Sequence, residues 1–198
     1  MKEEIPKEEI SKAVYTNVVA DSITTTNVSK KIGEGSAYFS GVPSQRLKCS
    51  VQNLNFGMKD FTIEFWVYPE TQTMAYPVLC GDDSNVNLVF FLADSASSGN
   101  ISLQVNGRII NTGKKYKPNI WTHYALVRKD GVFTIYENGI NIGETSSYIT
   151  TNVNISSLSI GGNSSTSNTA YKGYIDDFVI YDYSKYTQEF TVTNKPIL

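Results

Sequence analysis

The sequence predicts an all-β domain, a sandwich of antiparallel strands, and three observations support this prediction. Short segments alternate apolar and polar side chains with a period of two, as residues 61–68 (FTIEFWVY) do, which is typical of strands with two unlike faces. Turn-forming residue pairs separate these segments, and helical periodicity is almost absent. Many short strands, with a turn about every 8–12 residues, predict a β-sandwich or jelly roll. The length of 198 residues suits one such domain.

The same alternation predicts the individual strands. They are residues 61–68, 85–93, 101–105, 121–128, 132–136 and 174–181. Asn106-Gly107, Asp130-Gly131 and Asn138-Gly139 lie between strand-like runs, and such pairs readily adopt the positive φ angles of a type I′ hairpin turn. We therefore expect an antiparallel meander from residue 121 onward, with one turn of helix later, within residues 184–190.

The chain is expected to divide into three parts. Residues 1–28 form an N-terminal arm, which opens with the Lys/Glu-rich segment MKEEIPKEEISK, too short and too polar to fold alone. Residues 29–191 form the β domain, and residues 192–198 form a C-terminal tail. The first residues are charged and lack the apolar core of a secretory signal, so we expect synthesis in a cytoplasm without export by that route.

Charge and hydropathy exclude two classes of partner. The net charge is −2 and no run of Lys or Arg occurs. Nucleic-acid binding needs clustered cations, and so does electrostatic binding to a membrane surface. No apolar run approaches the ~20 residues of a membrane-spanning helix. We therefore expect neither a nucleic-acid nor a membrane partner.

The two cysteines, Cys49 and Cys80, both lie in strand-like segments. Small buried thiols are one interpretation and a disulfide between them is the other, with cytoplasmic synthesis favouring the thiols. Two thiols and a single histidine do not make a zinc site.

Six short motifs occur in an order that resembles a known family. They are GSAYFSG (35–41), DFTIEFWV (60–67), WTHYALVR (121–128), YENG (136–139), SIGG (159–162) and GYIDD (173–177). Together they resemble the laminin-G-like members of the concanavalin A-like lectin/glucanase superfamily, over about residues 30–190. The segment SKYTQEF (184–190) resembles the end of the copies of this module in bacteriophage structural proteins.

The resemblance implies a concanavalin A-like jelly roll of two antiparallel sheets. A protein of this family is expected to require no cofactor, but family members often hold a structural Ca²⁺ ion at the sheet edge. By position this implicates Asp176, carbonyl groups of residues 31–35, and Asp21 as a second acid. The other interpretation is that one of the paired acids Asp176 and Asp177 accepts hydrogen bonds from backbone N–H groups while the other faces solvent.

Catalysis is not expected, because glycoside hydrolysis needs two carboxyl groups that flank the bond. The glucanase relatives place such acids along one strand as E-x-D-x-E, and this triplet is absent. Glu64 stands alone on its strand, Glu70 follows a proline, and Asp176 and Asp177 are adjacent, so they should point to opposite faces. The lone histidine, His123, is interpreted as structural.

Sugar binding is weighed against ordinary polar turns, because lectin sites combine aromatic platforms with polar loop residues. The candidate surface for glycans or protein partners consists of Tyr76, Asp82, Asp83, Asn85, Tyr148, Asn163 and Tyr171. The function expected is a non-catalytic accessory protein of a phage virion, a head fibre, capsid decoration or tail component, anchored to other virion proteins by the arm. The alternative is a free-standing carbohydrate-binding or adhesion module of a bacterial protein. A homo-oligomer is compatible with either.

Overall fold

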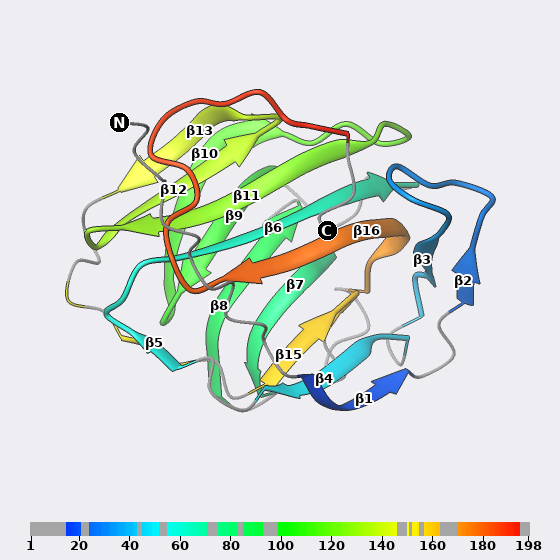
Figure 1. The fold of residues 1–198 in the computed structure, drawn as a ribbon, viewed down its shortest axis with the longest axis horizontal. Coiled ribbons are helices and arrows are strands. Elements are labelled where there is room, and N and C mark those ends of the chain that lie inside the picture. The colour runs from blue at the N-terminus through cyan, green and yellow to red at the C-terminus, as the bar shows by residue number, and fades with distance from the viewer. Residues whose placement is uncertain are drawn as a thin grey trace, which may run out of the picture.

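The computed structural model describes residues 15–20, 24–42, 45–51, 55–70, 75–82, 85–92, 99–145, 150, 152–154, 157–162 and 170–194. These residues form two stacked antiparallel sheets and no helix (Figure 1), as the sequence predicted. Consequently, within these ranges there is no helix that could cross a membrane.

Sheet A and sheet B each contain seven strands. Sheet A follows the order β1 (Tyr15–Ala20), β4 (Leu47–Val51), β15 (Ser157–Ile160), β7 (Ala75–Asp82), β8 (Asn85–Leu92), β9 (Asn100–Val105), β10 (Arg108–Lys115). Sheet B follows the order β13 (Ile140–Thr145), β12 (Val132–Glu137), β11 (Thr122–Lys129), β6 (Phe61–Pro69), β16 (Lys172–Tyr181), β3 (Ser36–Ser40), β2 (Thr24–Thr26). A small pair joins β5 (Asn55–Gly57) and β14 (Val153–Asn154).

The core lies between the two sheets, and the alternation along β6 explains why. Phe61, Ile63, Phe65 and Val67 are fully buried in the main hydrophobic cluster. The ring of Phe65 meets Phe90 of sheet A edge to face, with centroids 5.4 Å apart, a geometry that aromatic pairs favour. The intervening residues of β6 therefore point to the outer face of sheet B.

The predicted meander and its turns are confirmed. β11 pairs with β12 and β12 with β13, both antiparallel. The turn residues Asp130 and Asn138 have φ angles of 48° and 51°, and the glycines that follow them also have positive φ. Positive φ at both central positions matches a type I′ turn.

The N-terminal arm is shorter than the 28 residues expected. β1 pairs with β4 at the edge of sheet A, and β2 pairs with β3 at the edge of sheet B. The prediction was therefore wrong for residues 15–20 and 24–26, which belong to the sandwich because each adds a strand to a sheet edge. Residues 1–14 lie outside the described residues.

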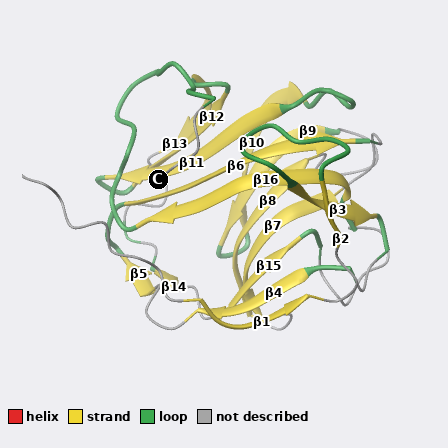
Figure 2. Cartoon of the chain, turned by 45° about the vertical axis from the view of Figure 1, so that its right-hand side comes forward, coloured by secondary structure: helices red, strands yellow, loops and turns green. Residues whose placement is uncertain are grey.

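The predicted helical turn in residues 184–190 is also wrong. This segment is irregular and extended, and it runs across the outer face of sheet B. Figure 2 shows it as a green loop that arches past β12 and β13. We call residues 183–190 the strap.

The two cysteines lie on strands on either side of β15. Leu158 of β15 is the register partner of both Cys49 and Cys80. Two strand spacings separate their Cα atoms by ~10 Å, and a disulfide spans at most ~7 Å. The structure therefore excludes a disulfide between them and agrees with the interpretation as thiols.

Candidate functional site

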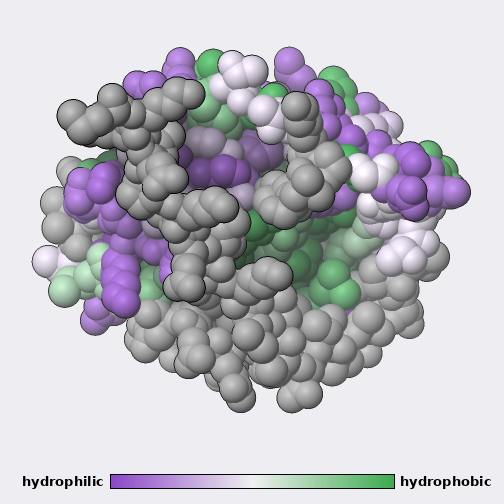
Figure 3. All heavy atoms as spheres, viewed as in Figure 1, coloured by the Kyte–Doolittle hydropathy of each residue, from purple (hydrophilic) through white to green (hydrophobic). Residues whose placement is uncertain are grey.

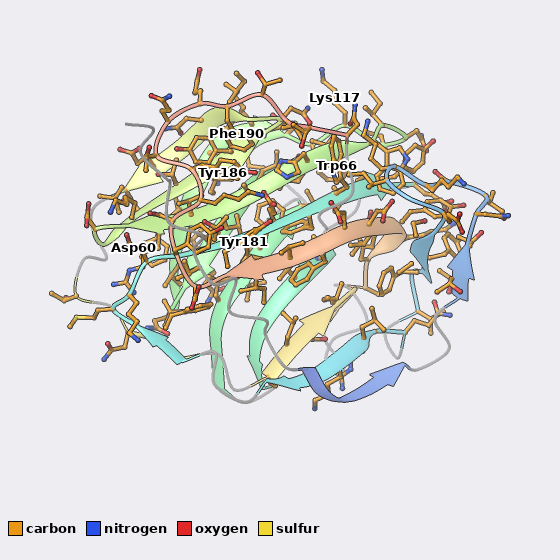
Figure 4. All side chains as sticks on the ribbon, viewed as in Figure 1. Asp60, Trp66, Lys117, Tyr181, Tyr186 and Phe190 are labelled. Atoms are coloured by element: carbon orange, nitrogen blue, oxygen red, sulfur yellow. The ribbon has the colours of Figure 1, made fainter. Side chains whose placement is uncertain are left out.

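The outer face of sheet B carries polar and aromatic side chains in place of a simple solvated surface. On β6 the outward residues are Thr62, Glu64, Trp66 and Tyr68, alternating with the core residues. The strap covers the part of this face around Glu64, while the part around Tyr68 is not covered by it. Figure 4 shows Tyr181, Tyr186 and Phe190 across the face, with Trp66 farther along β6.

Glu64 is the centre of a buried polar cluster beneath the strap, and its side chain is 4% exposed. Its Oε1 accepts hydrogen bonds from the Tyr181 hydroxyl (2.9 Å) and the Lys185 ammonium. Its Oε2 accepts one from the Tyr186 hydroxyl (2.6 Å) and lies 3.5 Å from Nε2 of His123. Both carboxylate oxygens are thus fully engaged.

These contacts set the pKa of Glu64. Burial alone would raise the pKa of this carboxyl, but hydrogen bonds from His123, Lys185 and Tyr186 outweigh burial and lower the pKa to about 2. Burial and the Glu64 carboxylate together raise the pKa of the Tyr181 and Tyr186 phenols. At neutral pH Glu64 is therefore a carboxylate and both phenols are neutral.

The strap ends on the β12–β13 turn. The Phe190 N–H donates to the carbonyl of Gly139 (3.0 Å), and a Cβ atom at Gly139 would overlap the Phe190 carbonyl. The Phe190 ring stacks on Tyr186 at 3.5 Å and meets Tyr136 at 5.4 Å. Close backbone approach thus requires glycine at position 139.

His123 has the structural environment that was expected for it. It is 4% exposed, and its ring meets Trp66 at 5.2 Å and Phe190 at 6.0 Å, both edge to face. Because the strap covers it together with Glu64, neither residue can reach a substrate while the strap is in place.

Four half-buried aromatic residues cross the other part of this face. We call Tyr38, Tyr68, Trp121 and Tyr174 the aromatic row. Tyr174 of β16 is the register partner of both Tyr38 on β3 and Tyr68 on β6. Successive ring centroids are 4.9 Å (Tyr38–Tyr174), 5.8 Å (Tyr174–Tyr68) and 5.6 Å (Tyr68–Trp121) apart. The row therefore spans three strand spacings, ~14 Å.

Charged and polar groups border the aromatic row on both sides along the strands. Beyond Tyr68, Glu70 accepts a hydrogen bond from the Tyr38 hydroxyl (3.3 Å) and lies 3.8 Å from the Lys172 ammonium. On the other side, the Lys31 ammonium lies over the Trp66 ring, 4.4 Å from its centroid. Burial, followed by the charge of Glu70, raises the pKa of Tyr38 and Tyr174. Both phenols therefore remain neutral donors at physiological pH.

Asp176 fixes the loop that carries Lys31. Its Oδ2 accepts hydrogen bonds from the backbone N–H groups of Lys31 (2.9 Å) and Ile32 (3.0 Å), and its Oδ1 accepts one from Asp177 N–H (2.9 Å). This is the backbone-network interpretation of the paired acids. Three N–H dipoles direct positive charge at the oxygens a cation would use, so this carboxylate does not fit Ca²⁺ in the described geometry.

Ca²⁺ nevertheless stays a prediction at this edge. Asp21, its expected second acid, lies outside the described residues. Within the part of the chain that the structure describes, no three His, Cys, Asp or Glu side chains gather as metal ligands.

A β-bulge changes the expected directions of the two acids. Asp176 pairs with Trp66 and Val179 with Glu64, so Asp177 and Phe178 together oppose one residue of β6. Asp177 takes a left-handed conformation with φ of 48°, and Phe178 takes the inward position, stacked on Phe65 at 5.8 Å. Strict alternation, which placed the acids on opposite faces, therefore fails here.

A cavity of about 370 Å³ opens next to this bulge, between the sheets. Among the described residues, its lining includes Thr25, Gly35, Ser36, Ala37, Leu47, Ile160, Ile175, Asp176, Asp177 and Phe178. Figure 3 shows hydrophobic side chains in a hollow beside the position of β16. We call it the edge cavity.

The predicted glycan surface is only partly placed by the structure. Tyr76 is the second residue of β7 and Asp82 its last, so their backbones are ~20 Å apart. Asp82 pairs with Asn85 across the β7–β8 hairpin. The two residues of the hairpin therefore lie near the opposite end of β7 from Tyr76. Their side chains, and the whole of Asp83, Tyr148 and Asn163, lie outside what the structure describes.

Tyr171 does not lie on a surface, contrary to the prediction. It is 1% exposed, meets Phe39 edge to face at 5.9 Å, and donates its hydroxyl to the Tyr174 carbonyl at 2.9 Å. A tyrosine whose hydroxyl donates to a backbone acceptor can be fully buried. The sequence did not indicate this burial, because Tyr171 only precedes a predicted strand.

Sequence reasoning also missed the aromatic row. Its four members come from separate strands or strand ends, and only the sheet order brings them together. One signal was available: the alternation in residues 61–68 placed Trp66 and Tyr68 on the polar face. Large aromatic side chains on such a face can indicate a binding surface.

Residues 39–189 match the Laminin_G_3 family, described as the concanavalin A-like lectin/glucanases superfamily. The match covers more than half of the chain, which therefore belongs to this family. No curated protein sequence matches the chain significantly.

Several solved structures share the fold. Domain 4 of an extracellular GH43 arabinanase from Geobacillus stearothermophilus, solved with arabinotriose, has a TM-score of 0.66 and 22% identity, covering 83% of this chain and 77% of that one. The heptameric SAP-like pentraxin of Limulus polyphemus has a TM-score of 0.57 and 19% identity, covering 76% of each chain. The ligand-binding domain of botulinum neurotoxin serotype D, solved with N-acetylneuraminic acid, has a TM-score of 0.62 and 12% identity. This last match covers 92% of our chain but only 44% of the toxin domain.

Proposed function

We propose that this protein is a non-catalytic carbohydrate-binding module, and that the aromatic row is its binding platform. The row itself is the observation that supports this most directly. Half-buried aromatic rings in an open line, bordered by Glu70, Lys172 and Lys31, combine apolar contact area with groups that hydrogen-bond hydroxyls. Two of the structures with the same fold were solved with a sugar.

The chemistry of Glu64 supports a binding role over a catalytic one. A glycosidase needs an accessible pair of carboxyl groups, one of them able to hold a proton near neutral pH. Glu64 is covered by the strap and its pKa of about 2 keeps it ionised. Asp176 is committed to three backbone N–H groups.

Truncation of the row tests the proposal. A glycan array that includes arabino-oligosaccharides and sialylated oligosaccharides identifies a ligand, and isothermal titration then measures its affinity. We expect Trp121→Ala and Tyr174→Ala each to weaken binding about tenfold, as removal of a central aromatic contact does at other interfaces. Tyr183→Ala is the matched control, because Tyr183 is an exposed tyrosine outside the row, and it should bind as the wild type does. Retention of no glycan, or equal affinity of all four proteins, would refute the proposal.

The phage virion role stays the alternative prediction, as does location in the virion. The motif on which it rests, residues 184–190, forms most of the strap. Contacts of Lys185, Tyr186 and Phe190 hold the strap on the outer face of sheet B. Folding therefore accounts for these residues without a virion. An adhesion module of a virion would satisfy both ideas.

A further inference from the structure

Two Asn-Gly pairs occupy equivalent hairpin turns of this protein. Asn106-Gly107 joins β9 to β10, and Asn138-Gly139 joins β12 to β13. The φ angles are 46° and 80° in the first pair and 51° and 83° in the second, as type I′ turns require. The two turns therefore share a sequence and a backbone conformation, and they differ in what packs against them.

An asparagine that precedes glycine can lose its side-chain amide without an enzyme. The glycine backbone nitrogen attacks the amide carbon of the asparagine side chain, a C–N bond forms, and ammonia leaves with the proton of that nitrogen. Water then adds to either carbonyl group of the resulting succinimide ring, which opens to aspartate or to isoaspartate. Water is the only co-reactant. Glycine favours the first step because it has no side chain to obstruct the attack.

The folded turn must open before this ring can form, because the backbone has to rotate out of the hairpin conformation to bring the two reacting atoms together. The rate at each pair therefore depends on the free energy of local opening. That free energy is low where a segment is exposed and has few contacts, and high where other elements are packed on it.

The Asn106-Gly107 turn has few contacts. Both residues are exposed, and nothing lies within 4 Å of a Cβ atom placed on Gly107. The Asn106 side chain donates one hydrogen bond, to the carbonyl of Asn152 (2.8 Å) on the exposed surface. Strand β10, which follows the turn, lies at the edge of sheet A and pairs there with β9. Opening this turn therefore disturbs little else.

The Asn138-Gly139 turn is held from two sides. Asn138 donates its N–H to the His123 carbonyl (2.8 Å), and its Oδ1 accepts the His123 N–H (3.0 Å). Gly139 is buried, and its carbonyl accepts the N–H of Phe190 at the end of the strap (3.0 Å). Opening this turn must therefore displace the strap as well.

We propose that Asn106 is a site of spontaneous deamidation, and that the strap protects Asn138 from the same reaction. Each event at Asn106 adds a negative charge to the edge hairpin of sheet A. The isoaspartate product also lengthens the backbone within a tight two-residue turn.

Incubation of the full chain at mildly alkaline pH tests the proposal. Peptide mapping by mass spectrometry follows both pairs in the same sample, and fragmentation distinguishes aspartate from isoaspartate. We expect Asn106 to react about tenfold faster than Asn138, the ratio that a modest difference in opening free energy produces. In concentrated urea the two pairs should react at similar rates, because unfolding removes the difference in packing.

Two variants separate the contributions. Asn106→Gln should abolish the fast reaction and leave the slow one. Phe190→Ala removes the ring that stacks on Tyr186, so it should accelerate the reaction at Asn138 and leave the rate at Asn106 unchanged.

Equal rates at the two pairs in the folded protein, or no reaction at Asn106, would overturn the proposal. A ratio that persists in urea would also overturn it, because sequence rather than packing would then be the cause. An unchanged rate at Asn138 in folded Phe190→Ala would remove the protective role of the strap. If that variant does not fold, the comparison of folded and unfolded wild type still decides the proposal.

Discussion

At the scale of single residues, two adjacent acids have different roles because of one extra residue in β16. Asp176 faces the amide groups of the β2–β3 loop, and Asp177, displaced by the bulge, lines the edge cavity. Regular alternation would have separated them by face alone. The bulge instead separates them by partner: backbone N–H groups satisfy the Asp176 carboxylate, whereas the Asp177 carboxylate has no hydrogen bond to the part of the chain that the structure describes.

Replacing Asp176 tests whether its hydrogen bonds stabilise the loop between β2 and β3. We expect Asp176→Asn to lower the free energy of unfolding by about 2 kcal/mol, because the uncharged amide oxygen of asparagine accepts weaker hydrogen bonds from the two loop amides than a carboxylate does. Urea unfolding measures this difference. On the same geometry, EDTA should leave the melting temperature of the wild type unchanged. A drop with EDTA that Ca²⁺ restores would show that a structural ion, not the amide network, holds this edge.

Asp176 also shows what sequence can predict at this scale. The motif GYIDD indicated both the strand and the choice between a cation and a backbone network. The donors, Lys31 and Ile32, lie 144 residues or more away along the chain. Only the packing of their loop on β16 determines which N–H groups Asp176 binds. Tyr171 failed for a similar reason, because its burial depends on Phe39 of another strand.

At the scale of elements, the strap explains why sheet B can carry a buried glutamate on its outer face. Tyr186 and Lys185 satisfy Glu64, while Phe190 covers Tyr136 and reaches the Gly139 turn. The meander below it was predictable, because Asn-Gly and Asp-Gly turns and alternating strands are local signals. The strap was not, since its extended path is set by contacts with β6, β11 and β12 rather than by its own residues.

Two glycines in equivalent turns isolate the contribution of the strap. Gly139 and Gly107 each follow an asparagine in a hairpin and have φ angles of 83° and 80°. A Cβ at Gly139 would overlap the Phe190 carbonyl, whereas nothing lies within 4 Å of one at Gly107. We expect Gly107→Ala to cost about 1–2 kcal/mol for the left-handed conformation alone. Gly139→Ala should cost about 2 kcal/mol more, because the end of the strap is displaced.

Urea unfolding of both variants measures the difference, and tyrosine accessibility reports whether Tyr186 becomes exposed. Equal costs for the two substitutions would mean that the strap contributes little to the stability of the fold.

At the scale of the whole molecule, sheet B presents two unlike regions on one face. One is covered by the strap around an ionised glutamate, and the other is the open aromatic row. The row lies where the strap does not reach, so the proposed binding platform and the Glu64 cluster consist of separate residues. If the row binds glycans as proposed, we expect substitutions in it to change affinity while the Glu64 cluster keeps the sandwich intact.

The Glu64 cluster should make the stability of the whole molecule depend on pH in acid. The pKa of Glu64 falls from its ordinary value of 4.5 to about 2 on folding. Its contribution is therefore fully present above about pH 4.5 and is lost as the pH falls toward 2, by about 3 kcal/mol in total. Urea unfolding from about pH 7 down to about pH 3 should show this decline in the wild type. The glutamine of the Glu64→Gln variant cannot ionise. The variant should therefore be less stable than the wild type at neutral pH and should lose less stability in the acid range. Parallel pH profiles for the two proteins would mean that another carboxyl group, not Glu64, controls acid stability.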